Sequence, residues 1–425
     1  MRILFLTNFY QVNTGGEEQS CQQVVEGLQQ RGHSTLVLTS MHGTNNVPVK
    51  ADGTYRSLYL EVDLVPWRHS ITFFTKRKAR EKYNLQCFER VLEQFAPDIV
   101  FIWGMWNLPR SLAVLAEARY PDKVIYRFAT YWPTLPSAHE FYWRAPGRKW
   151  YSQIPKHLLG HFALSMLANE LQKYPLTFKH AICVSAASRS ILVEAGIPVS
   201  NARIVYTGLD VNKYLNGKQP QQAHDERSLN LLYAGRLDSD KGIDTAIEAM
   251  TKLVFGQGKR DIRLSLAGSG STEYENHLRE LVNQAGLIDF VTFLGWIPQT
   301  EMPKLLRNFD VLLLPSIWPE PFSRVVLEGM ISSLVVVATQ TGGTVEVLRD
   351  GENGLLFAAG DTEDLAQKIA SLADDHKLRL RLALAGRKTV AEKFTKTKMM
   401  DEIESYLQEV FRSSSLEKAS QLERK

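Results

Sequence analysis

Along the first half of this chain, segments with two different patterns of hydrophobic and polar residues follow one another in turn. Short runs rich in Val, Ile and Leu are typical of strands buried on both faces of a parallel sheet, and longer stretches with a helical period separate them. The expected strands are residues 2–9, 35–39, 98–103, 124–128, 181–185 and 203–206, and the expected helices are 17–31, 76–95, 109–119 and 186–194.

A second series of the same kind occupies the other half. Residues 217–228 before it hold almost no apolar side chain, which indicates a linker. Strand–helix alternation on both sides of a linker predicts an α/β protein with two Rossmann-like, doubly wound domains facing a central cleft. The expected strands are residues 229–234, 263–267, 290–294, 311–315, 334–339 and 354–357, and the expected helices are 243–255, 274–285, 300–308, 324–332 and 362–374.

These patterns divide the chain into segments. We expect a terminal helix that packs back on the first domain and a polar tail that frays. The segments are an N-terminal domain of residues 1–210, a linker of 211–228, a second domain of 229–394, the terminal helix of 395–412 and the tail of 413–425.

Composition narrows the class of protein. A chain of 425 residues suits two domains, and its 44% hydrophobic and 23% charged residues are typical of a globular protein. No apolar run is long enough for a membrane span, and the opening residues resemble a first strand rather than a signal peptide. Three widely spaced cysteines, Cys21, Cys87 and Cys183, indicate buried thiols in a reducing cytoplasm.

The charge is unevenly distributed. Residues 1–205 hold 23 Lys and Arg against 15 Asp and Glu, whereas the rest holds 27 against 31. This asymmetry indicates different partners for the two halves, but the excess is too small and diffuse to predict nucleic-acid binding.

Two loops of the second domain carry candidate phosphate contacts. Gly235, Arg236 and, five residues later, Lys241 follow a strand and precede a helix. A diphosphate needs cations and inward-pointing amides, and such a turn supplies both; two surface cations beside a glycine turn are the alternative. The turn at residues 268–273 is weaker evidence, because Ser271 or Thr272 also suits a helix N-cap.

Residues 313–330 carry the strongest signal. Glu320 lies in a loop after a strand, and Glu328 lies on the apolar helix that follows. Their spacing of two helical turns lets both face one cleft, and the helix N-terminus favours anions. Glu328 is costly to bury without a partner, and it suits ribose hydroxyls; an internal ion pair with Arg324 is the alternative. Gly342 and Gly343 permit either a close backbone approach or a simple turn.

Taken as a set, these motifs resemble the donor domain of the retaining glycosyltransferases of family 4, which have the GT-B fold. The resemblance covers most of residues 229–372. It implies that Arg236 and Lys241 bind the donor diphosphate, that Glu320 is the catalytic residue at the sugar, and that Glu328 binds the ribose. The other residues that it implies are Phe322, Ser323 and Val325 at the donor, with Ser323 in place of the usual Gly, and Gly295, Trp296 and Ile297 at the nucleobase.

The first domain would then be the acceptor side. Gly15 and Gly16 resemble the family's glycine loop, which reaches the donor phosphates, although Thr14 followed by Glu17 also predicts a helix capping box. Many relatives have a His-Asp pair where this chain has Ala129 and Thr130, so we do not transfer that role. His139 is a weaker substitute, because an exposed loop pair with Glu140 is expected there.

Two basic, aromatic-rich stretches stand out in the first domain. Residues 66–90 hold seven Lys and Arg against two Glu, and residues 142–161 hold four and no acid. Such segments can lie on an anionic membrane that carries lipid-linked acceptors, or they can be solvated helix faces.

The resulting hypothesis is a cytoplasmic glycosyltransferase, peripheral on the inner face of a membrane. It would move a sugar from a nucleoside diphosphate donor to a glycan, lipid-linked or small-molecule acceptor with retention, using no cofactor and no obligatory metal, and domain closure would exclude water. A nucleotide-sugar epimerase of the same fold and a degenerate binding scaffold are the alternatives. The sequence does not identify the sugar, the nucleotide or the acceptor.

Overall fold

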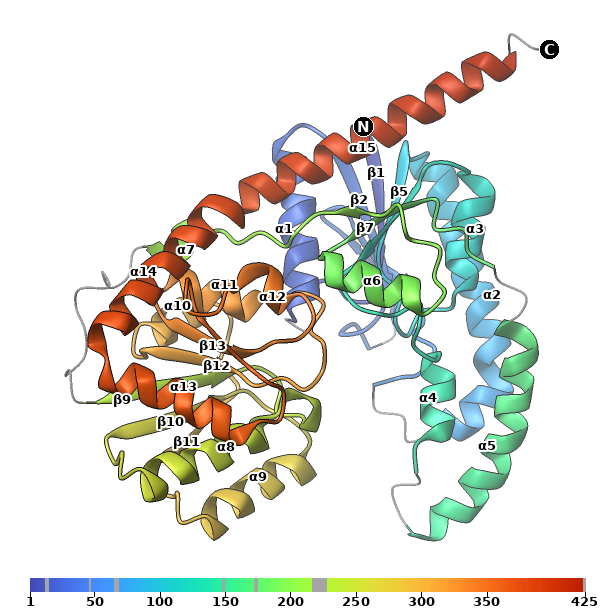
Figure 1. Ribbon diagram of the computed structural model, residues 1–425. Coiled ribbons are helices and arrows are strands. Elements are labelled where there is room, and N and C mark those ends of the chain that lie inside the picture. Colours follow the sequence, from blue (N-terminus) through green and yellow to red (C-terminus); the bar gives the residue numbers. More distant parts are fainter. Residues whose placement is uncertain are drawn as a thin grey trace. The chain divides into compact units, whose positions relative to one another are not determined.

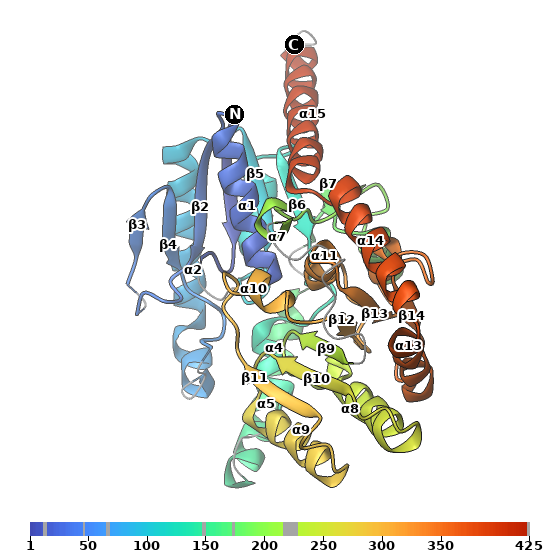
Figure 2. The ribbon, with the colours of Figure 1, turned by 90° about the vertical axis from the view of Figure 1, so that its left-hand side faces the viewer.

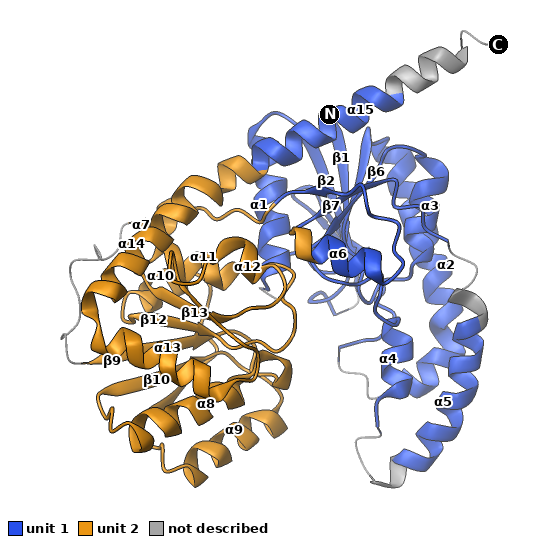
Figure 3. Cartoon of the chain, in the orientation of Figure 1, with its two compact units in different colours: residues 1–184, 188–205, 400–425 blue, residues 185–187, 206–399 orange. Residues whose placement is uncertain are grey.

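A computed structural model describes residues 1–11, 15–45, 47–64, 69–146, 150–171, 175–215 and 228–422 (Figure 1). The chain forms two compact units, coloured separately in Figure 3. Unit 1 consists of residues 1–184, 188–205 and 400–425, and unit 2 consists of residues 185–187 and 206–399. Most of the expected linker, residues 216–227, lies outside the described residues.

Unit 1 is built on one sheet. Its described strands lie in the order β3-β4-β2-β1-β5-β6-β7-β8, and only β3 is antiparallel to its neighbour. Figure 2 shows them extending from β3 at one edge. The strands are β1 (Arg2–Thr7), β2 (Ser34–Ser40), β3 (Val49–Ala51), β4 (Thr54–Leu58), β5 (Ile99–Gly104), β6 (Val124–Phe128), β7 (His180–Cys183) and β8 (Arg203–Ile204).

The helices of unit 1 include two that the periodicity did not predict, α4 and α5. The helix α5 contains Pro155 and a run of apolar residues without a helical period, which explains why the sequence pattern missed it. The helices are α1 (Gly16–Gln30), α2 (His69–Phe95), α3 (Ser111–Arg119), α4 (Ala138–Arg144), α5 (Trp150–Leu171) and α6 (Ala186–Glu194), of which α6 begins in the short segment assigned to unit 2.

Unit 2 contains a second sheet, which is parallel throughout the described strands, in the order β11-β10-β9-β12-β13-β14. Its strands are β9 (Leu229–Ala234), β10 (Ile262–Ala267), β11 (Val291–Gly295), β12 (Val311–Leu314), β13 (Val335–Thr339) and β14 (Leu355–Phe357). Its helices are α7 (Asn212–Leu215), α8 (Ile243–Thr251), α9 (Thr272–Gln284), α10 (Met302–Leu306), α11 (Arg324–Ile331), α12 (Thr344–Val347), α13 (Thr362–Asp374) and α14 (His376–Lys393).

An inner strand of unit 2, β13, explains the apolar runs of the sequence. All five residues of β13 are buried, so both faces of the strand are covered. A parallel sheet covered on both faces directs its polar chemistry to the loops at the carboxyl ends of its strands. The predicted pair of Rossmann-like α/β domains is confirmed.

The last helix, α15 (Lys396–Leu422), is part of unit 1 from Met400 onward. Arg31 at the end of α1 donates hydrogen bonds to Glu404 and Asp401, both at 2.6 Å, and His33 Nε2 lies 2.8 Å from Glu404. A Cβ on Gly27 of α1 would lie 2.8 Å from the Met400 side chain, so the two helices are in close contact. The helix also continues through residues 413–422, where a frayed tail was expected.

We predict that Glu404→Gln weakens the contact between α15 and α1. The hydrogen bonds of Glu404 with His33 and Arg31 lower the pKa of its carboxyl group, so their contribution to stability is present above the ordinary pKa and is lost at more acidic pH. Thermal or urea unfolding at pH 7 should show a loss of about 1 kcal/mol, which shrinks below a pH of about 4. The control, Glu402→Gln, should unfold like the parent chain; an equal loss in both variants would contradict the prediction.

Candidate functional site

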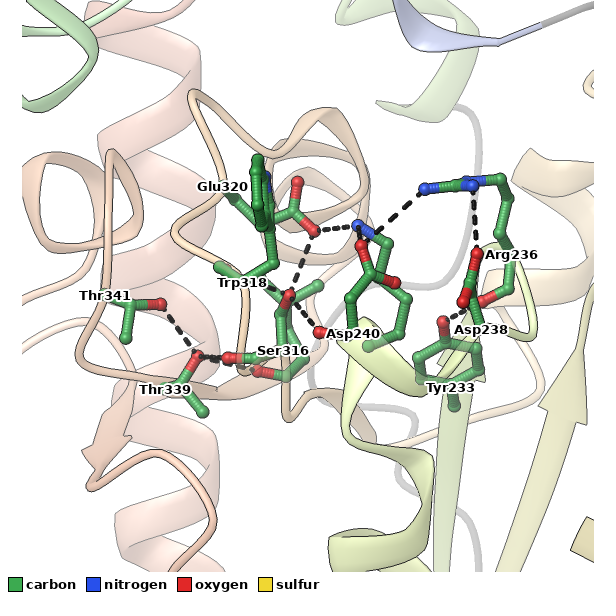
Figure 4. A network of polar contacts seen from close by, with 11 residues as sticks. Tyr233, Arg236, Asp238, Asp240, Ser316, Trp318, Glu320, Thr339 and Thr341 are labelled. Atoms are coloured by element: carbon green, nitrogen blue, oxygen red, sulfur yellow. Dashed lines mark hydrogen bonds and ion pairs between the residues drawn. The ribbon is translucent and has the colours of Figure 1, made fainter. Parts of the chain in front are cut away.

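Three loops meet at the carboxyl edge of the unit 2 sheet (Figure 4). The loop after β9 is joined to the loop after β12, because the carbonyl oxygen of Asp240 accepts hydrogen bonds from the amides of Ile317 (2.9 Å) and Trp318 (3.1 Å). The loop after β13 joins them through the Gly343 amide, which donates to the Glu320 carbonyl at 2.8 Å. Backbone hydrogen bonds therefore set the relative positions of all three loops.

Glycine allows this close approach at two positions. Gly242 has a φ of +64°, and a Cβ there would lie 2.0 Å from the Pro315 carbonyl oxygen. Gly342 has a φ of +54°, and its Cβ would lie 2.3 Å from the Glu320 carbonyl oxygen. The sequence left a turn and a close backbone approach as alternatives for Gly342, and the structure has both.

Lys241 and Glu320, predicted for the diphosphate and the sugar, contact one another. Lys241 Nζ lies 2.7 Å from Glu320 Oε1 and 3.6 Å from Asp240 Oδ2. The Ser316 hydroxyl, which is buried beneath the loop, lies 3.2 Å from the same Glu320 oxygen. Both side chains are largely buried, at 14% and 18% exposure, so the ion pair is held in a fixed geometry.

Arg236 has a different environment. Its side chain is 68% exposed and pairs with Asp238 at 3.2 Å and Asp240 at 3.8 Å. The Tyr233 hydroxyl donates to the Arg236 carbonyl oxygen, which fixes the backbone and leaves the guanidinium in solvent. The two cations of the loop thus differ, because the Arg236 side chain is exposed and the Lys241 side chain is largely buried.

Glu328 lies in a separate buried network. It is 3% exposed, and its Oε1 accepts hydrogen bonds from Arg324 Nε (2.9 Å) and Gln299 Nε2 (2.8 Å). The ion pair with Arg324, weighed above as the alternative, is therefore present. Arg324 Nη1 is buried and has no hydrogen-bond partner among the described residues. The ribose role of Glu328 stays a prediction.

The other residues predicted at the donor surround the start of α11. Ser323 is the N-cap residue, but its side chain makes no capping hydrogen bond. Phe322 packs its ring against Tyr206 at 5.5 Å, and Val325 packs on the neighbouring hydrophobic core.

The residues predicted at the nucleobase follow β11. Gly295 has a φ of +70°, and Trp296 is 61% exposed. Ile297 packs on the core of unit 2. In the neighbouring loop, Ser271 caps α9 by accepting a hydrogen bond from the Tyr274 amide at 3.2 Å, which confirms the helix-cap interpretation of that turn.

In unit 1 the glycine loop begins a helix. Gly15 is the N-cap of α1 and Gly16 its first residue; both are exposed, and Thr14 lies outside the described residues. Glu17 is the next residue of α1. Burial, and to a lesser extent Glu18, raise its pKa to about 8, and its Oε1 has no hydrogen-bond partner among the described residues. Arg127, fully buried over the Trp103 ring, opposes this shift through its charge.

The expected exposed loop at His139 and Glu140 is wrong. His139 lies on α4, is 5% exposed, and places its Nδ1 3.2 Å from Nε2 of His69 on α2. Burial lowers the pKa of both rings, that of His69 to about 4, so the pair is neutral at pH 7. His139 packs against the rings of Phe73 and His69, and no pattern local to His139 indicates these contacts.

Three residues of these networks were not found from the sequence. Asp240 forms ion pairs with both cations of the β9 loop, and Gln299 donates a hydrogen bond to Glu328. The charge of Arg127 acts on Glu17, the residue that follows Gly16. The acidic spacing Asp238, Asp240 beside two cations was a usable signal for the first. In the described part of the chain, no three His, Cys, Asp or Glu side chains form a metal-binding group.

Two family models match this chain. One, described as glycosyltransferase family 4, matches residues 14–213, and the other, described as glycosyl transferases group 1, matches residues 217–389. Together they span most of the sequence. The chain belongs to the family 4-like glycosyltransferases.

Curated relatives of this chain agree with that assignment. The lipopolysaccharide core biosynthesis glycosyltransferase LpsE of Rhizobium meliloti is 34% identical over 174 residues, which is 41% of this chain and 47% of LpsE. The chain spans about half the length of several curated relatives it matches, between 47% and 55%.

Solved structures show that this chain has the GT-B fold. Sucrose-phosphate synthase from Thermosynechococcus elongatus aligns with a TM-score of 0.72 and 17% identity, over 97% of this chain and 99% of that one. HepE from Anabaena, in complex with UDP, aligns with a TM-score of 0.66 and 20% identity, over 96% and 100%. The predicted family and fold are confirmed.

We predict that Gly342→Ala destabilises unit 2. Any L-residue at a positive φ costs about 1 kcal/mol, and the clash with the Glu320 carbonyl adds about 1–3 kcal/mol. Gly351 is the matched control, because its φ is +70° and no atom lies within 4 Å of its Cβ position. Urea unfolding should give a clearly larger loss for Gly342→Ala than for Gly351→Ala; equal losses would show that the loops are not in close contact.

Proposed function

We propose that this glycosyltransferase moves a sugar from a nucleoside diphosphate sugar to a glycan or lipid-linked acceptor, with retention at the anomeric carbon. The observation that carries the proposal is the contact of Lys241 with Glu320 where the β9, β12 and β13 loops are joined, with Arg236 linked to Lys241 through Asp240. Cations beside a carboxylate at the carboxyl edge of a parallel sheet suit a diphosphate leaving group next to a sugar.

The chemical demand of the reaction is the charge that grows on the departing diphosphate. Lys241 would exchange its contact with Glu320 for a phosphate oxygen, and the exposed Arg236 would move onto the same group. Glu320, released from Lys241, would orient the sugar and stabilise positive charge at its anomeric carbon. The first-turn amides of α11 would hold the remaining phosphate oxygens, so the proposal needs no metal.

The buried network around Glu328 supports a ribose contact. Arg324 Nη1 is a buried donor without a partner among the described residues, and leaving it so costs free energy. A ribose hydroxyl could accept from it while donating to Glu328. Trp296, exposed at the end of β11, would contact the nucleobase.

UDP-glucose is the first donor to test. HepE, which shares this fold, has been solved with UDP-glucose, and LpsE acts in lipopolysaccharide core biosynthesis. The ligand of HepE supports a nucleotide-sugar donor for this chain. The name of LpsE supports a glycan product. A cytoplasmic location would match such a donor.

We predict that Glu320→Gln lowers turnover at least about 100-fold, because it removes a charge at the reacting carbon and leaves the donor phosphates their cations. Donor release and product anomer should be followed by NMR, with UDP-glucose among a panel of nucleotide sugars and with membrane glycans as acceptors. Glu352→Gln, exposed and paired only with Arg349 in the described structure, is the control.

The same assay separates the alternatives. Acceptor-dependent turnover with the donor's anomeric configuration supports the proposal, whereas interconversion of donors without acceptor would indicate an epimerase. A thermal shift with UDP-glucose but no turnover would indicate a binding scaffold, since a ligand at a hundred times its Kd adds about 2.7 kcal/mol of stability.

We also propose that unit 1 contacts an anionic membrane through α2, α4 and α5. Large apolar side chains are exposed on these helices, and Phe74 of α2 lies 6.2 Å from Phe162 of α5, ring to ring. Exposed basic residues accompany them, among them Lys76 and Lys78. The apolar residues are Ile71, Phe74, Phe141, Ile154, Leu158, Leu159 and Phe162.

The described helices include none long and apolar enough to cross a membrane, so any contact through this face would be peripheral. Residues 66–68 of the first basic stretch and residues 147–149 of the second lie outside the described residues. The proposal therefore rests on the exposed residues of α2, α4 and α5 given above.

We predict that Leu158→Ser combined with Phe162→Ser lowers co-sedimentation with phosphatidylglycerol vesicles about tenfold, because two apolar side chains no longer enter the lipid. Ile288→Ser in unit 2, at a position equally exposed at 65%, is the control. Binding that ignores the anionic lipid, or is unchanged in the double variant, would refute the membrane contact; pelleting without vesicles would assign the face to self-association.

A further inference from the structure

Ser316 is a buried serine at the place where the loops after β9, β12 and β13 meet. It is 0% exposed and follows the last residue of β12 by two positions. Its Oγ lies 3.2 Å from Oε1 of Glu320, 3.1 Å from the Trp318 carbonyl oxygen and 3.3 Å from the Asp240 carbonyl oxygen. A serine hydroxyl has a single proton to donate, so these three acceptors compete for it.

The backbone of Ser316 is held from the neighbouring strand. Thr339, the last residue of β13, is fully buried and donates its hydroxyl proton to the Ser316 carbonyl oxygen at 2.7 Å. Figure 4 shows the resulting series, in which dashed lines join Thr339 to Ser316 and Ser316 to Glu320. With its backbone fixed and its side chain buried, Ser316 redirects its proton most easily by rotation of the hydroxyl hydrogen.

The Glu320 carboxylate is the strongest of the three acceptors. The Asp240 carbonyl already accepts two backbone amides, which occupy both of its lone pairs. The Trp318 carbonyl is neutral, and a hydrogen bond to an ionised oxygen is about twice as strong as one between neutral groups. Lys241 Nζ makes the shorter contact with Oε1, at 2.7 Å, and the Ser316 contact is longer than an O–H···O bond usually is. The hydroxyl can therefore form a stronger bond with Glu320 than it does while Lys241 holds the same oxygen.

The proposed transfer takes Lys241 away from Glu320, because the donor phosphates would bind its ammonium group. The Glu320 side chain is only 18% exposed, so water cannot fully replace that contact. A largely buried carboxylate oxygen that loses a donor costs free energy unless another donor takes over. Ser316 is the neighbouring donor on the same oxygen. The other oxygen, Oε2, accepts no hydrogen bond from the described residues, so it is available to a hydroxyl group of the sugar.

We propose that Ser316 is a positioning residue for Glu320. When Lys241 binds the donor phosphates, the Ser316 hydroxyl donates to Oε1 and holds the carboxylate so that Oε2 faces the transferred sugar. This inference rests on the proposed function, which assigns Glu320 to the sugar and Lys241 to the diphosphate. Because none of the three contacts of Ser316 is with a cation of the β9 loop, the binding of the nucleotide alone should not depend on it.

The test compares the binding of a nucleotide with that of its sugar derivative by isothermal titration calorimetry. UDP, GDP and ADP, each with its glucose derivative, are titrated into the full chain, and the pair that binds most tightly is used. Ser316→Ala should raise the Kd of the nucleotide sugar at least about fivefold and leave that of the nucleotide within about twofold, because only the hydrogen bond to Glu320 is lost. Ser371→Ala is the matched control, since it removes a serine hydroxyl that donates to the Lys368 carbonyl at 2.7 Å within α13. It should change neither Kd.

A double-mutant cycle separates positioning from a merely structural role. If Ser316 acts through Glu320, then Ser316→Ala should cause no further loss of nucleotide-sugar affinity in a chain that already carries Glu320→Ala. A general disturbance of the loop would persist in that background, and it would also raise the Kd of the nucleotide. The nucleotide titration of each variant therefore reports whether unit 2 is folded.

Two results would overturn the positioning role and leave the proposed function intact. One is an unchanged ratio of the two Kd values in Ser316→Ala, and the other is an equal loss of sugar affinity with and without Glu320. If none of the three nucleotide pairs binds the parent chain, the proposed function is wrong and the role of Ser316 is wrong with it.

Discussion

The hydrogen bonds from the Ile317 and Trp318 amides to the Asp240 carbonyl are the constraint on which the candidate donor site depends. These bonds hold two loops, which follow the adjacent strands β9 and β12, in a single arrangement. The backbone of the two loops thus brings Lys241 and Glu320 close enough for Nζ of the one to lie 2.7 Å from Oε1 of the other. The packing of the loop backbones therefore shapes the site, and Gly242 and Gly342 allow that packing. The side chains of the loops then supply its charges.

Most polar side-chain atoms of the candidate donor site in unit 2 pair with one another, but not all of them do. Lys241 pairs with Glu320, while Arg324 leaves one buried nitrogen unpaired beside Glu328. Burying such groups costs free energy that hydrogen bonds within the fold only partly recover, and a ligand that supplies oxygen atoms recovers the rest. In unit 1, burial likewise raises the pKa of the carboxyl groups of Glu17 and Glu61 into the neutral range.

Hydrophobic periodicity predicted the central strands closely, because a strand buried on both faces must be apolar throughout. The prediction failed for elements that are not buried in this way. All three residues of β3 are exposed, and α5 keeps apolar residues on its exposed face, so neither has the pattern of its class. The polar composition beyond residue 412 likewise indicated a tail, although the helix α15 continues to Leu422. Helix α14 was also missed, because its apolar residues do not gather on one face of the helix.

The sequence by itself determined the family, the two α/β units and the residue types at the donor loops, since each follows from short motifs placed between apolar strands. Only the tertiary structure decided which partners those residues have. Glu328 meets Gln299, which is 29 residues earlier in the chain, and His139 meets His69, which is 70 residues away. Such pairs depend on how helices pack across the sheet, and no local pattern encodes a contact between segments that meet only after folding.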